Sequence, residues 1–506
     1  MSSPRTSLRQ VAQTLLLEFR TAITERRKRS APTLPDPVLQ APGPGTPKPT
    51  GGKPLPVPMG PVTAPSSPLG LGRTLTFASG RGMVTLTDFV GSSGDSDMYR
   101  STVGVQPVIV VWLRTRDTGA QQRLASALRR KAPTASFLWP TEIVSAPDVP
   151  GFGAVIPMDV GGGFVPLGSW LATRPPLRRA ATVAFHLASD FLSLHTSGFL
   201  FGHPRLHDFL VHPDSAELRI AGCERMVGVS EGPWRDSGTG ELLAPELLAG
   251  SAPPGTQGDL HSLAVLMFLL LAGHHPFLGK RALGYSTLDT GAVEALCRAA
   301  VFLLHPSDRS NEAVPLTADP TGRAGGHALA RWNVLPGPLQ HALLTTLVDG
   351  VRNPSVRTPA SVFRLQLARL LDAIFQCPKC GADRIYDLQG TRQAGGAPVC
   401  PSCGQTTALP ARIRVRKNVV VLPAGAQLFS HHLDPAQVCT LMSPIAEVCP
   451  HPSRPGVLGL RNLTPDKWVV ARPDGSLRDV DPGRSVLLES GTTIQFGRAD
   501  GEVRMA

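Results

Sequence analysis

Four of the eight cysteines in this chain form two matching Cys-Pro-x-Cys-Gly motifs. Cys377 and Cys380 belong to the first motif, Cys400 and Cys403 belong to the second, and 19 residues lie between Cys380 and Cys400. This is the spacing of a zinc ribbon, in which four thiolates close a tetrahedral shell around Zn²⁺ and leave no open position for water. We therefore predict a structural zinc site. Redox chemistry of the two cysteine pairs is the alternative.

The regions around these motifs divide the 506 residues into several parts. Residues 1–30 have apolar side chains at helical spacing and end in a basic run, which predicts a basic amphipathic helix. Its basic end is either solvated or a docking site for a partner or an anionic surface. Residues 31–70 hold 13 prolines and are a predicted Pro-rich linker. Residues 376–412 contain the predicted zinc ribbon, and residues 413–506 are β-rich, with short apolar runs between turn signals typical of a small β-sandwich-like module.

Residues 71–375 form the largest predicted domain. Apolar runs typical of strands, Val84–Leu86 and Pro107–Leu113, come first, and a helix is expected over 118–130. Longer helices are then expected over residues 176–197, 258–273, 291–304, 337–349 and 359–375. Strands followed by helices predict an α+β fold, with a small β-rich lobe joined to a larger helical lobe.

The composition limits the classes of partner and compartment. The net charge of +12 permits contact with nucleic acid, but it is an average over the whole chain, and we do not expect a nucleic-acid partner. Cysteines in metal-binding pairs indicate a reducing compartment, and the start of the chain shows no secretory signal. The longest apolar run, Leu263 to Ala272, is shorter than the roughly 20 residues that span a bilayer. We therefore expect a cytoplasmic protein with no transmembrane segment.

Several motifs follow one another between about residue 80 and residue 375. In chain order they are Val90–Tyr99 with two glycines, the apolar strand Val108–Trp112, the loop His195–Val211, the short segment Ile220–Glu224, Leu-Ala-Pro-Glu-Leu at 243–247, Gly258–Ala264, and Val356–Ala360. This order resembles that of a protein kinase. It is most similar to bacterial serine/threonine protein-kinase-like proteins of tellurium-resistance-type phosphorylation cassettes. The resemblance implies a bilobal kinase-like fold and protein partners of the phosphatase or von Willebrand A type.

The resemblance places the nucleotide-binding positions on residues that differ from those of active kinases. In active kinases a glycine-rich loop covers the phosphates, and two of its glycine positions are retained here, Gly91 and Gly94. The lysine position falls on Val111, which cannot make a charge-assisted bond, and the metal-binding aspartate position falls on Gly222. The segment Gly153–Met158 matches the hinge between the lobes.

The catalytic-loop positions have also changed. By the same resemblance, His203 stands at the catalytic aspartate position and Asp208 at the metal-binding asparagine position. Glu224, close to Gly222, is a carboxylate that can substitute in part for the lost aspartate. Whether ATP and Mg²⁺ bind is therefore left open.

The positions that hold the large lobe of a kinase together are retained. Glu246 matches the end of the activation segment, and Arg357 is placed like the buried arginine that pairs with it. Asp259 matches the aspartate that braces the catalytic-loop backbone; without the resemblance, it would be a helix-capping residue. A chain that keeps the residues that hold the large lobe together but lacks the residues that bind ATP has the pattern of a pseudokinase.

Three functions follow as hypotheses. The first is a pseudokinase that acts as a regulator or scaffold in a bacterial phosphorylation signalling system. The second is an active atypical serine/threonine protein kinase that uses His203, or Asp208 and Glu224 with a metal. The third is a phosphopeptide-binding adaptor, because Ser430–His432 and the β-rich end resemble parts of forkhead-associated domains. A plain β-module that packs on the ribbon or on a partner is the alternative for that last region.

Overall fold

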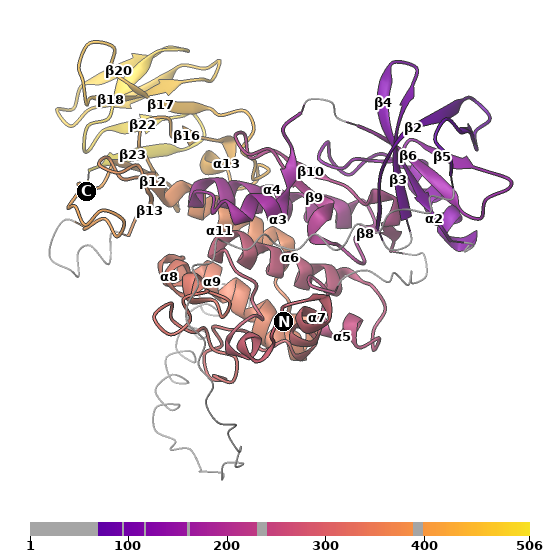
Figure 1. Cartoon of the computed structure of the whole chain (residues 1–506). Helices are drawn as coiled ribbons and strands as arrows, with labels where there is room; N and C mark the ends of the chain where they lie inside the picture. The colour runs from indigo at the N-terminus through magenta and orange to yellow at the C-terminus, as the bar shows by residue number, and fades with distance from the viewer. Residues whose placement is uncertain are drawn as a thin grey trace, which may run out of the picture. The chain divides into compact units, whose positions relative to one another are not determined.

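The computed structural model describes residues 69–93, 96–115, 118–158, 162–229, 240–387 and 398–505, which all fall within one structural unit of the chain. The predicted helix over residues 1–30 lies outside the described residues, as does the predicted linker up to residue 68. The described part is a mixed α+β protein with several sheets (Figure 1). Within it, no helix combines the length and the apolar character needed to cross a membrane.

Six antiparallel strands at the start of the described chain close into a barrel. In spatial order they are β1 (Thr74–Phe77), β2 (Met83–Ser93), β3 (Ser96–Val103), β4 (Gln106–Leu113), β6 (Phe152–Pro157) and β5 (Glu142–Ser145). Successive side chains of a strand face opposite sides of a sheet, so alternate residues such as Tyr99, Trp112 and Val144 fill the barrel core. Leu69, which the linker prediction included, is fully buried in the same core. The folded region therefore begins before residue 71.

The barrel corrects the expected hinge. Most of Gly153–Met158 belongs to strand β6, which pairs with β4 on one side and β5 on the other. The segment is a strand because Val155 and Ile156 are β-branched and buried. Helix α2 (Thr118–Leu128) ends two residues before its predicted limit, and its Leu124 packs with apolar residues of the strands.

The helices that follow the barrel share one apolar core. Helix α6 (Thr256–Ala272) is apolar on nearly all sides and buried along most of its length, as expected of a helix enclosed by others. Helix α4 (Leu177–Thr196) packs against both α6 and α11 (Ala360–Ala373). The other helices are α3 (Leu167–Ala172), α5 (Pro245–Leu248), α7 (Thr290–Ala299), α8 (Gly326–Val334), α9 (Gly337–Leu344), which continues as a π-helical turn over Thr345–Asp349, and α10 (Gly350–Arg352).

Two observed helix ends differ from the predicted ones, and the local backbone conformation gives the reason. Helix α7 begins where the Asp289 carboxylate accepts a hydrogen bond from the Ala292 N–H at 2.8 Å. It ends at Ala299 because Ala300 adopts a left-handed conformation with φ 46°, so the helix predicted over 291–304 is five residues too long. Helix α11 ends at Ala373, and the next residues form strand β12 (Ile374–Gln376). This strand pairs with β13 (Asp383–Ile385), so the cysteine region begins slightly before the predicted boundary at 376.

Two antiparallel sheets form the C-terminal region and enclose one apolar core that includes Trp468 and Ile494. One sheet has the order β15 (Asn418–Val421), β14 (Arg412–Val415), β23 (Asp500–Arg504), β22 (Thr493–Gln495), β19 (Trp468–Ala471) and β20 (Leu477–Val480). The other has the order β16 (Gln427–Leu428), β17 (Ala446–Pro450), β18 (Leu458–Asn462) and β21 (Ser485–Leu487). Two sheets around a shared core are the arrangement of a β-sandwich.

Candidate binding cavity and candidate metal centre

A cavity of 430 Å³ lies between the barrel and the segment of residues 205–225. Strands β3, β4 and β6 line the barrel side with apolar residues that include Met98, Ile109, Val111 and Ile156. Most of the lining is apolar, and no lysine is found among its described residues. A mostly apolar cavity with a small number of polar groups is typical of small-molecule sites.

The charged groups of the cavity lie on the side opposite the barrel. They are Arg205, Asp208, Arg219, Glu224 and Arg225. Short elements position them: the 3₁₀ turn Leu206–Asp208, the hairpin of β9 (Phe209–Val211) and β10 (Leu218–Ile220), and the 3₁₀ turn Cys223–Arg225. The Ala221 N–H donates to the Asp208 carbonyl oxygen at 2.7 Å, and this bond brings the two 3₁₀ turns together.

The guanidinium of Arg225 joins the two carboxylates. Its Nη2 lies 2.5 Å from Oδ1 of Asp208, and its Nε lies 3.3 Å from Oε1 of Glu224. The side chains of all three residues are buried, at 8% exposure or less. A buried charge requires a partner of opposite charge, so these three groups form one ionic unit. The second oxygen of Asp208 also accepts a hydrogen bond from the Arg205 N–H at 2.8 Å.

Gly222 makes room for this ionic unit. Its φ of 74° is left-handed, and a Cβ at this position would lie 2.3 Å from Nη2 of Arg225 and 2.8 Å from Oδ1 of Asp208. Any side chain would therefore clash with the ion pair and would also strain the backbone. Where the kinase resemblance expects a metal-binding aspartate, the chain needs a residue with no side chain.

Burial shapes the electrostatics at this end of the cavity. Desolvation raises the pKa of the Glu224 carboxyl, although the neighbouring Arg225 opposes the shift. Oε2 of Glu224 has no hydrogen-bond partner within the part of the chain that the structure describes. Desolvation also lowers the pKa of His207, another lining residue, so that its neutral form is favoured.

The other predicted nucleotide-site residues are placed unevenly. Val111 lies on the cavity wall, where its side chain is buried among apolar neighbours. Gly91 pairs with Met98 across the β2–β3 hairpin but does not line the cavity, and Gly94 lies outside the described residues. His203 also falls outside the cavity lining; its backbone N–H donates to the Phe201 carbonyl oxygen at 2.8 Å. The structure therefore brings Val111, Asp208, Gly222 and Glu224 to one site, but not His203 or Gly91.

Asp259 braces the loop that leads to this site. The side chain is 1% exposed and sits in the first turn of α6. Its carboxylate accepts hydrogen bonds from the N–H groups of Phe201 at 2.9 Å and Gly202 at 3.0 Å. Nε2 of His195 lies 3.0 Å from the same carboxylate. Asp259 does not cap its own helix. Its contacts are those expected of a residue that holds the loop backbone, and they differ from those of a helix cap.

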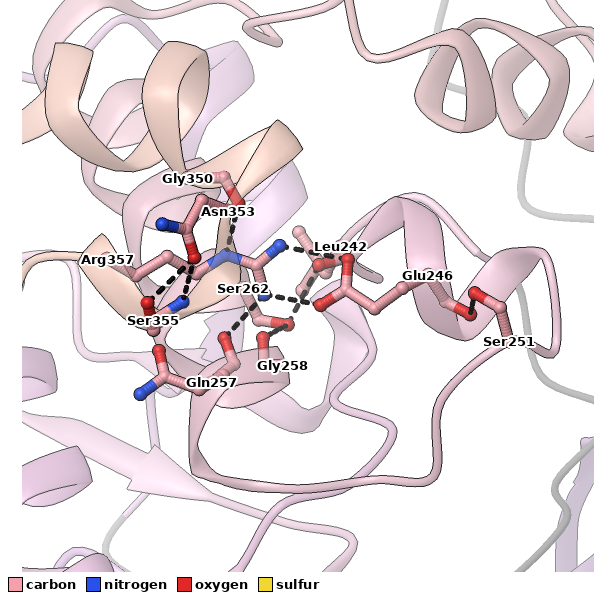
Figure 2. Close-up of polar contacts among 10 residues, drawn as sticks. All are labelled: Leu242, Glu246, Ser251, Gln257, Gly258, Ser262, Gly350, Asn353, Ser355 and Arg357. Atoms are coloured by element: carbon pink, nitrogen blue, oxygen red, sulfur yellow. Dashed lines mark hydrogen bonds and ion pairs between the residues drawn. The ribbon is translucent and has the colours of Figure 1, made fainter.

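Glu246 and Arg357, 111 residues apart in the chain, form a two-pronged ion pair (Figure 2). The Nη1–Oε1 distance is 2.5 Å and the Nη2–Oε2 distance is 2.9 Å. The guanidinium also donates to the carbonyl oxygens of Gly350 at 3.0 Å and Gln257 at 2.8 Å. This cluster ties α5 to the start of α6 and to the turn before α11.

His432 lies in the short helix α13 (Ser430–Leu433) and is 1% exposed. Its Nε2 lies 3.2 Å from both oxygens of Asp372 in α11, and its Nδ1 accepts from the Phe429 N–H at 2.9 Å. Desolvation lowers the pKa of the adjacent His431 to about 4. Both ring nitrogens of His432 are thus engaged inside the protein, which leaves this residue unsuited to a phosphopeptide.

The prediction that the four cysteines of the two motifs come together is confirmed. The sulfur atoms of Cys377, Cys380, Cys400 and Cys403 all lie within 4.8 Å of one another. The Cys377–Cys403 and Cys380–Cys400 sulfur distances are 3.9 and 3.8 Å. Metal–thiolate bonds of about 2.3 Å in a tetrahedron give sulfur–sulfur edges of about 3.8 Å, whereas a disulfide measures about 2.05 Å. The cluster therefore has the dimensions to hold a metal ion.

Two tight turns aim these sulfurs. In each turn the glycine after the second cysteine, Gly381 or Gly404, is left-handed, and its N–H donates to the carbonyl oxygen of the first cysteine. The N–H groups of Cys380 and Lys379 lower the pKa of the Cys377 thiol. Amide donors that favour the thiolate suit a metal ligand, because the thiolate is the form that binds.

Sequence reasoning did not single out Arg225. In the sequence it is a basic residue beside Glu224, and charged neighbours of this kind are usually solvated. One signal was present in the sequence. Arg225 directly follows Glu224 and lies three residues after the expected metal-binding position at Gly222. The comparisons with known proteins add no further signal, since neither a protein-family model nor a curated protein matches this chain.

Proposed function

We propose that this chain is a protein-kinase-like protein that binds ligands and partners but does not transfer phosphate. The observation that carries the proposal is the bond of Arg225 to both Asp208 and Glu224. These carboxylates are the ones that a kinase-like site would offer to Mg²⁺. Arg225 already bonds one oxygen of each carboxylate and offsets one of their two negative charges, so these groups are poorly available to the metal ions that phosphate transfer requires.

Two further features support the loss of transfer. Val111 lies on the cavity wall at the position where a kinase-like site needs a lysine, and the described lining residues include no lysine. His203, at the base position, does not line the cavity. Phosphate transfer depends on positioned metal ions, a cation on the phosphates and a group that orients the attacking hydroxyl, so all three requirements are affected.

The kinase-like fold is itself part of the proposal. It rests on the resemblance of the motifs and on two clusters of contacts in which those motifs meet. Asp259 bonds the backbone of Phe201 and Gly202, and Arg357 bonds Glu246. Both clusters would hold a kinase-like lobe rigid, and rigidity suits a regulator or scaffold that acts by binding.

For the cysteine cluster we propose Zn²⁺ in a structural role. Four thiolates are soft ligands that favour zinc over magnesium or calcium. The cluster supplies four ligands from the protein, which leaves no coordination position for a substrate. The ion then stabilises the turns that carry Cys377 and Cys400.

The test is a phosphate-transfer assay on the full chain. The protein is incubated with γ-labelled ATP and Mg²⁺ or Mn²⁺, and label is counted in the chain itself and in added generic protein substrates. We expect no incorporation above that of the His203→Ala and Asp208→Ala variants. Incorporation by the wild type that either variant abolishes would establish the active-kinase alternative and refute the proposal.

A further inference from the structure

We propose that the connection between α3 and α4, together with α8, forms a second ligand site that takes an organic phosphate. Arg174 and Arg331 hold the phosphate group, and the apolar part of the ligand lies in the cavity that adjoins Arg174. Among the described residues, none that lines this cavity also lines the cavity beside the barrel. The inference is therefore independent of the proposed function.

The first observation is a group of basic side chains from two elements. Arg174 lies between α3 and α4, whereas His327 and Arg331 lie one helical turn apart on α8. Nη2 of Arg174 is 3.2 Å from Nε2 of His327, and the imidazole nitrogen must accept this bond because a guanidinium only donates. Nη2 of Arg331 is 3.5 Å from the carbonyl oxygen of Pro175, the residue after Arg174. Three basic side chains therefore meet where α8 contacts the α3–α4 connection.

This group has no acidic partner within the part of the chain that the structure describes. Desolvation lowers the pKa of Arg331, and the like charge of Arg174 lowers it further. Desolvation and both arginines lower the pKa of His327, and no described carboxylate opposes either shift. Asp319 acts on the neighbouring His274, but its carboxylate is held by backbone N–H groups of its own turn. Like charges that lie close together are unfavourable, and a bound anion removes that cost.

The two arginines differ in their structural contacts. Arg331 lies at the C-terminal end of α6, since a Cβ on Gly273 would be 3.6 Å from its Nη1. The negative end of a helix dipole favours a cation there, so Arg331 also stabilises the fold. Arg174 is exposed, and the side-chain hydrogen bond that the described residues give it is the one to His327. Its backbone is left-handed, with φ 54°, which is uncommon for a residue with a side chain. The fold thus holds Arg174 in place without an internal countercharge.

The adjoining cavity has a volume of 390 Å³, and Arg174 and Pro175 lie on its lining. Trp170 and Val165 add apolar surface to the lining, and Ser169 adds a hydroxyl group. This volume lies within the range of small-molecule sites and is much larger than a phosphate group alone. A phosphate joined to an apolar group therefore fits better than a free phosphate ion.

The charges match a phosphate better than a single carboxylate. The guanidinium groups of Arg174 and Arg331 carry one positive charge each, and a phosphate monoester carries about −1.5 to −2 at neutral pH. Guanidinium groups also bond phosphate oxygens in pairs. Arg179, on the same lining, donates to the Pro213 carbonyl oxygen at 2.8 Å and lies 3.9 Å from Asp214. The charge of Arg179 is thus partly offset and does not enter this match.

The experiment follows binding to the full chain by ³¹P nuclear magnetic resonance, with phenyl phosphate and inorganic phosphate as the probes. The ionic strength is kept constant, so that general screening does not change during the titration. We expect phenyl phosphate to bind at least roughly threefold more tightly than inorganic phosphate, because its ring leaves water for the cavity. A wild type without saturable binding of phenyl phosphate would overturn the inference. Equal Kd values for the two probes would overturn the organic ligand and leave a site for free phosphate.

Arg174→Gln, with Arg352→Gln as the matched control, locates the site. Both arginines are exposed, so we expect both variants to melt at the temperature of the wild type. Arg174→Gln should bind phenyl phosphate at least about tenfold more weakly, because it loses a charged hydrogen-bond donor, and the control should bind it like the wild type. The same Kd in the two variants would overturn the inference.

Arg219→Gln tests whether the probe enters the other cavity instead, since Arg219 lines the cavity beside the barrel. We expect this variant to bind phenyl phosphate with the Kd of the wild type. Weaker binding in Arg219→Gln, with Arg174→Gln unaffected, would place the probe beside the barrel and overturn the inference. None of these results depends on phosphate transfer, so a failure here leaves the proposed function standing.

Discussion

Replacing Arg357 by methionine should destabilise the helical region by several kcal/mol. The guanidinium has no exposed surface, and the Glu246 side chain is 18% exposed. Methionine preserves the apolar stem of the side chain but removes its four hydrogen bonds, two to Glu246 and one each to the carbonyl oxygens of Gly350 and Gln257. The change therefore isolates the charged and hydrogen-bonding part of the interaction from its packing.

The magnitude follows from the groups that lose their partner. The carbonyl oxygen of the buried Gly350 costs about 1 kcal/mol when left without a donor, and that of Gln257, an exposed residue in the first turn of α6, costs less. The Glu246 carboxylate recovers some hydration through its exposed edge, so its loss is nearer the lower end of the 1.5–3 kcal/mol typical of each charged hydrogen bond. The sum is about 3–5 kcal/mol, which matches the usual cost of breaking a buried ion pair by removing one partner. For a region of this size the melting temperature should fall by roughly 6–15 °C.

Urea unfolding followed by circular dichroism at the helical band measures this change, with Arg352→Met as the control. Arg352 is an exposed arginine five residues earlier in the chain, so its replacement should alter the free energy of unfolding by less than about 0.5 kcal/mol. Arg357→Lys should fall between the two, because lysine keeps the charge but cannot donate in a fork. If Arg357→Met and Arg352→Met were equally stable, the ion pair would contribute nothing and the argument would be refuted.

Three further changes test other parts of the molecule. We expect the purified wild type and Cys449→Ser to contain a metal ion, and Cys400→Ser to contain much less, as measured by elemental analysis. Equal metal content in the two variants would contradict a metal site at the cysteine cluster. Asp259→Asn should lower the free energy of unfolding by about 2–3 kcal/mol, because one neutral oxygen replaces a carboxylate that accepts from two N–H groups. Urea unfolding measures this change, and an unchanged midpoint would show that the bonds of Asp259 to the Phe201 and Gly202 backbone do not stabilise the fold. Desolvation raises the pKa of Asp190 from 3.8 to about 6, so the folded state binds a proton that the unfolded state has already released. The contribution of this group to the free energy of unfolding should therefore fall by about 3 kcal/mol as pH rises from 4 through 6. Asp190→Asn should flatten that slope, and a slope identical to that of the wild type would refute the assignment.

The cysteine cluster was the most predictable feature. Each pair of cysteines is held by a short turn, so local spacing alone brings Cys377 beside Cys380 and Cys400 beside Cys403. The glycine after each pair supplies the left-handed residue that the turn requires. Helices α2, α4, α6 and α11 were also predicted within two residues at each end, because their apolar spacing is a local property, whereas α3, α5 and α8 were not predicted.

Errors arose where a segment can be read in two ways. Residues 153–158 are apolar and end near a proline, which fits both a hinge and a strand; burial between β4 and β5 makes them a strand. The end of α11 was misplaced because Ile374 and Phe375 continue the apolar pattern of the helix while pairing with β13. In both cases the deciding contact lies outside the segment itself.

Short-range spacing in the chain was enough to predict the clustered cysteines and the positions of most of the longer helices. Long-range packing was needed to establish that Arg225 holds both Asp208 and Glu224, and that Arg357 reaches Glu246. The physical reason is that an ion pair depends on distance and burial, and neither can be read from charges in a sequence until the fold has excluded water from between them.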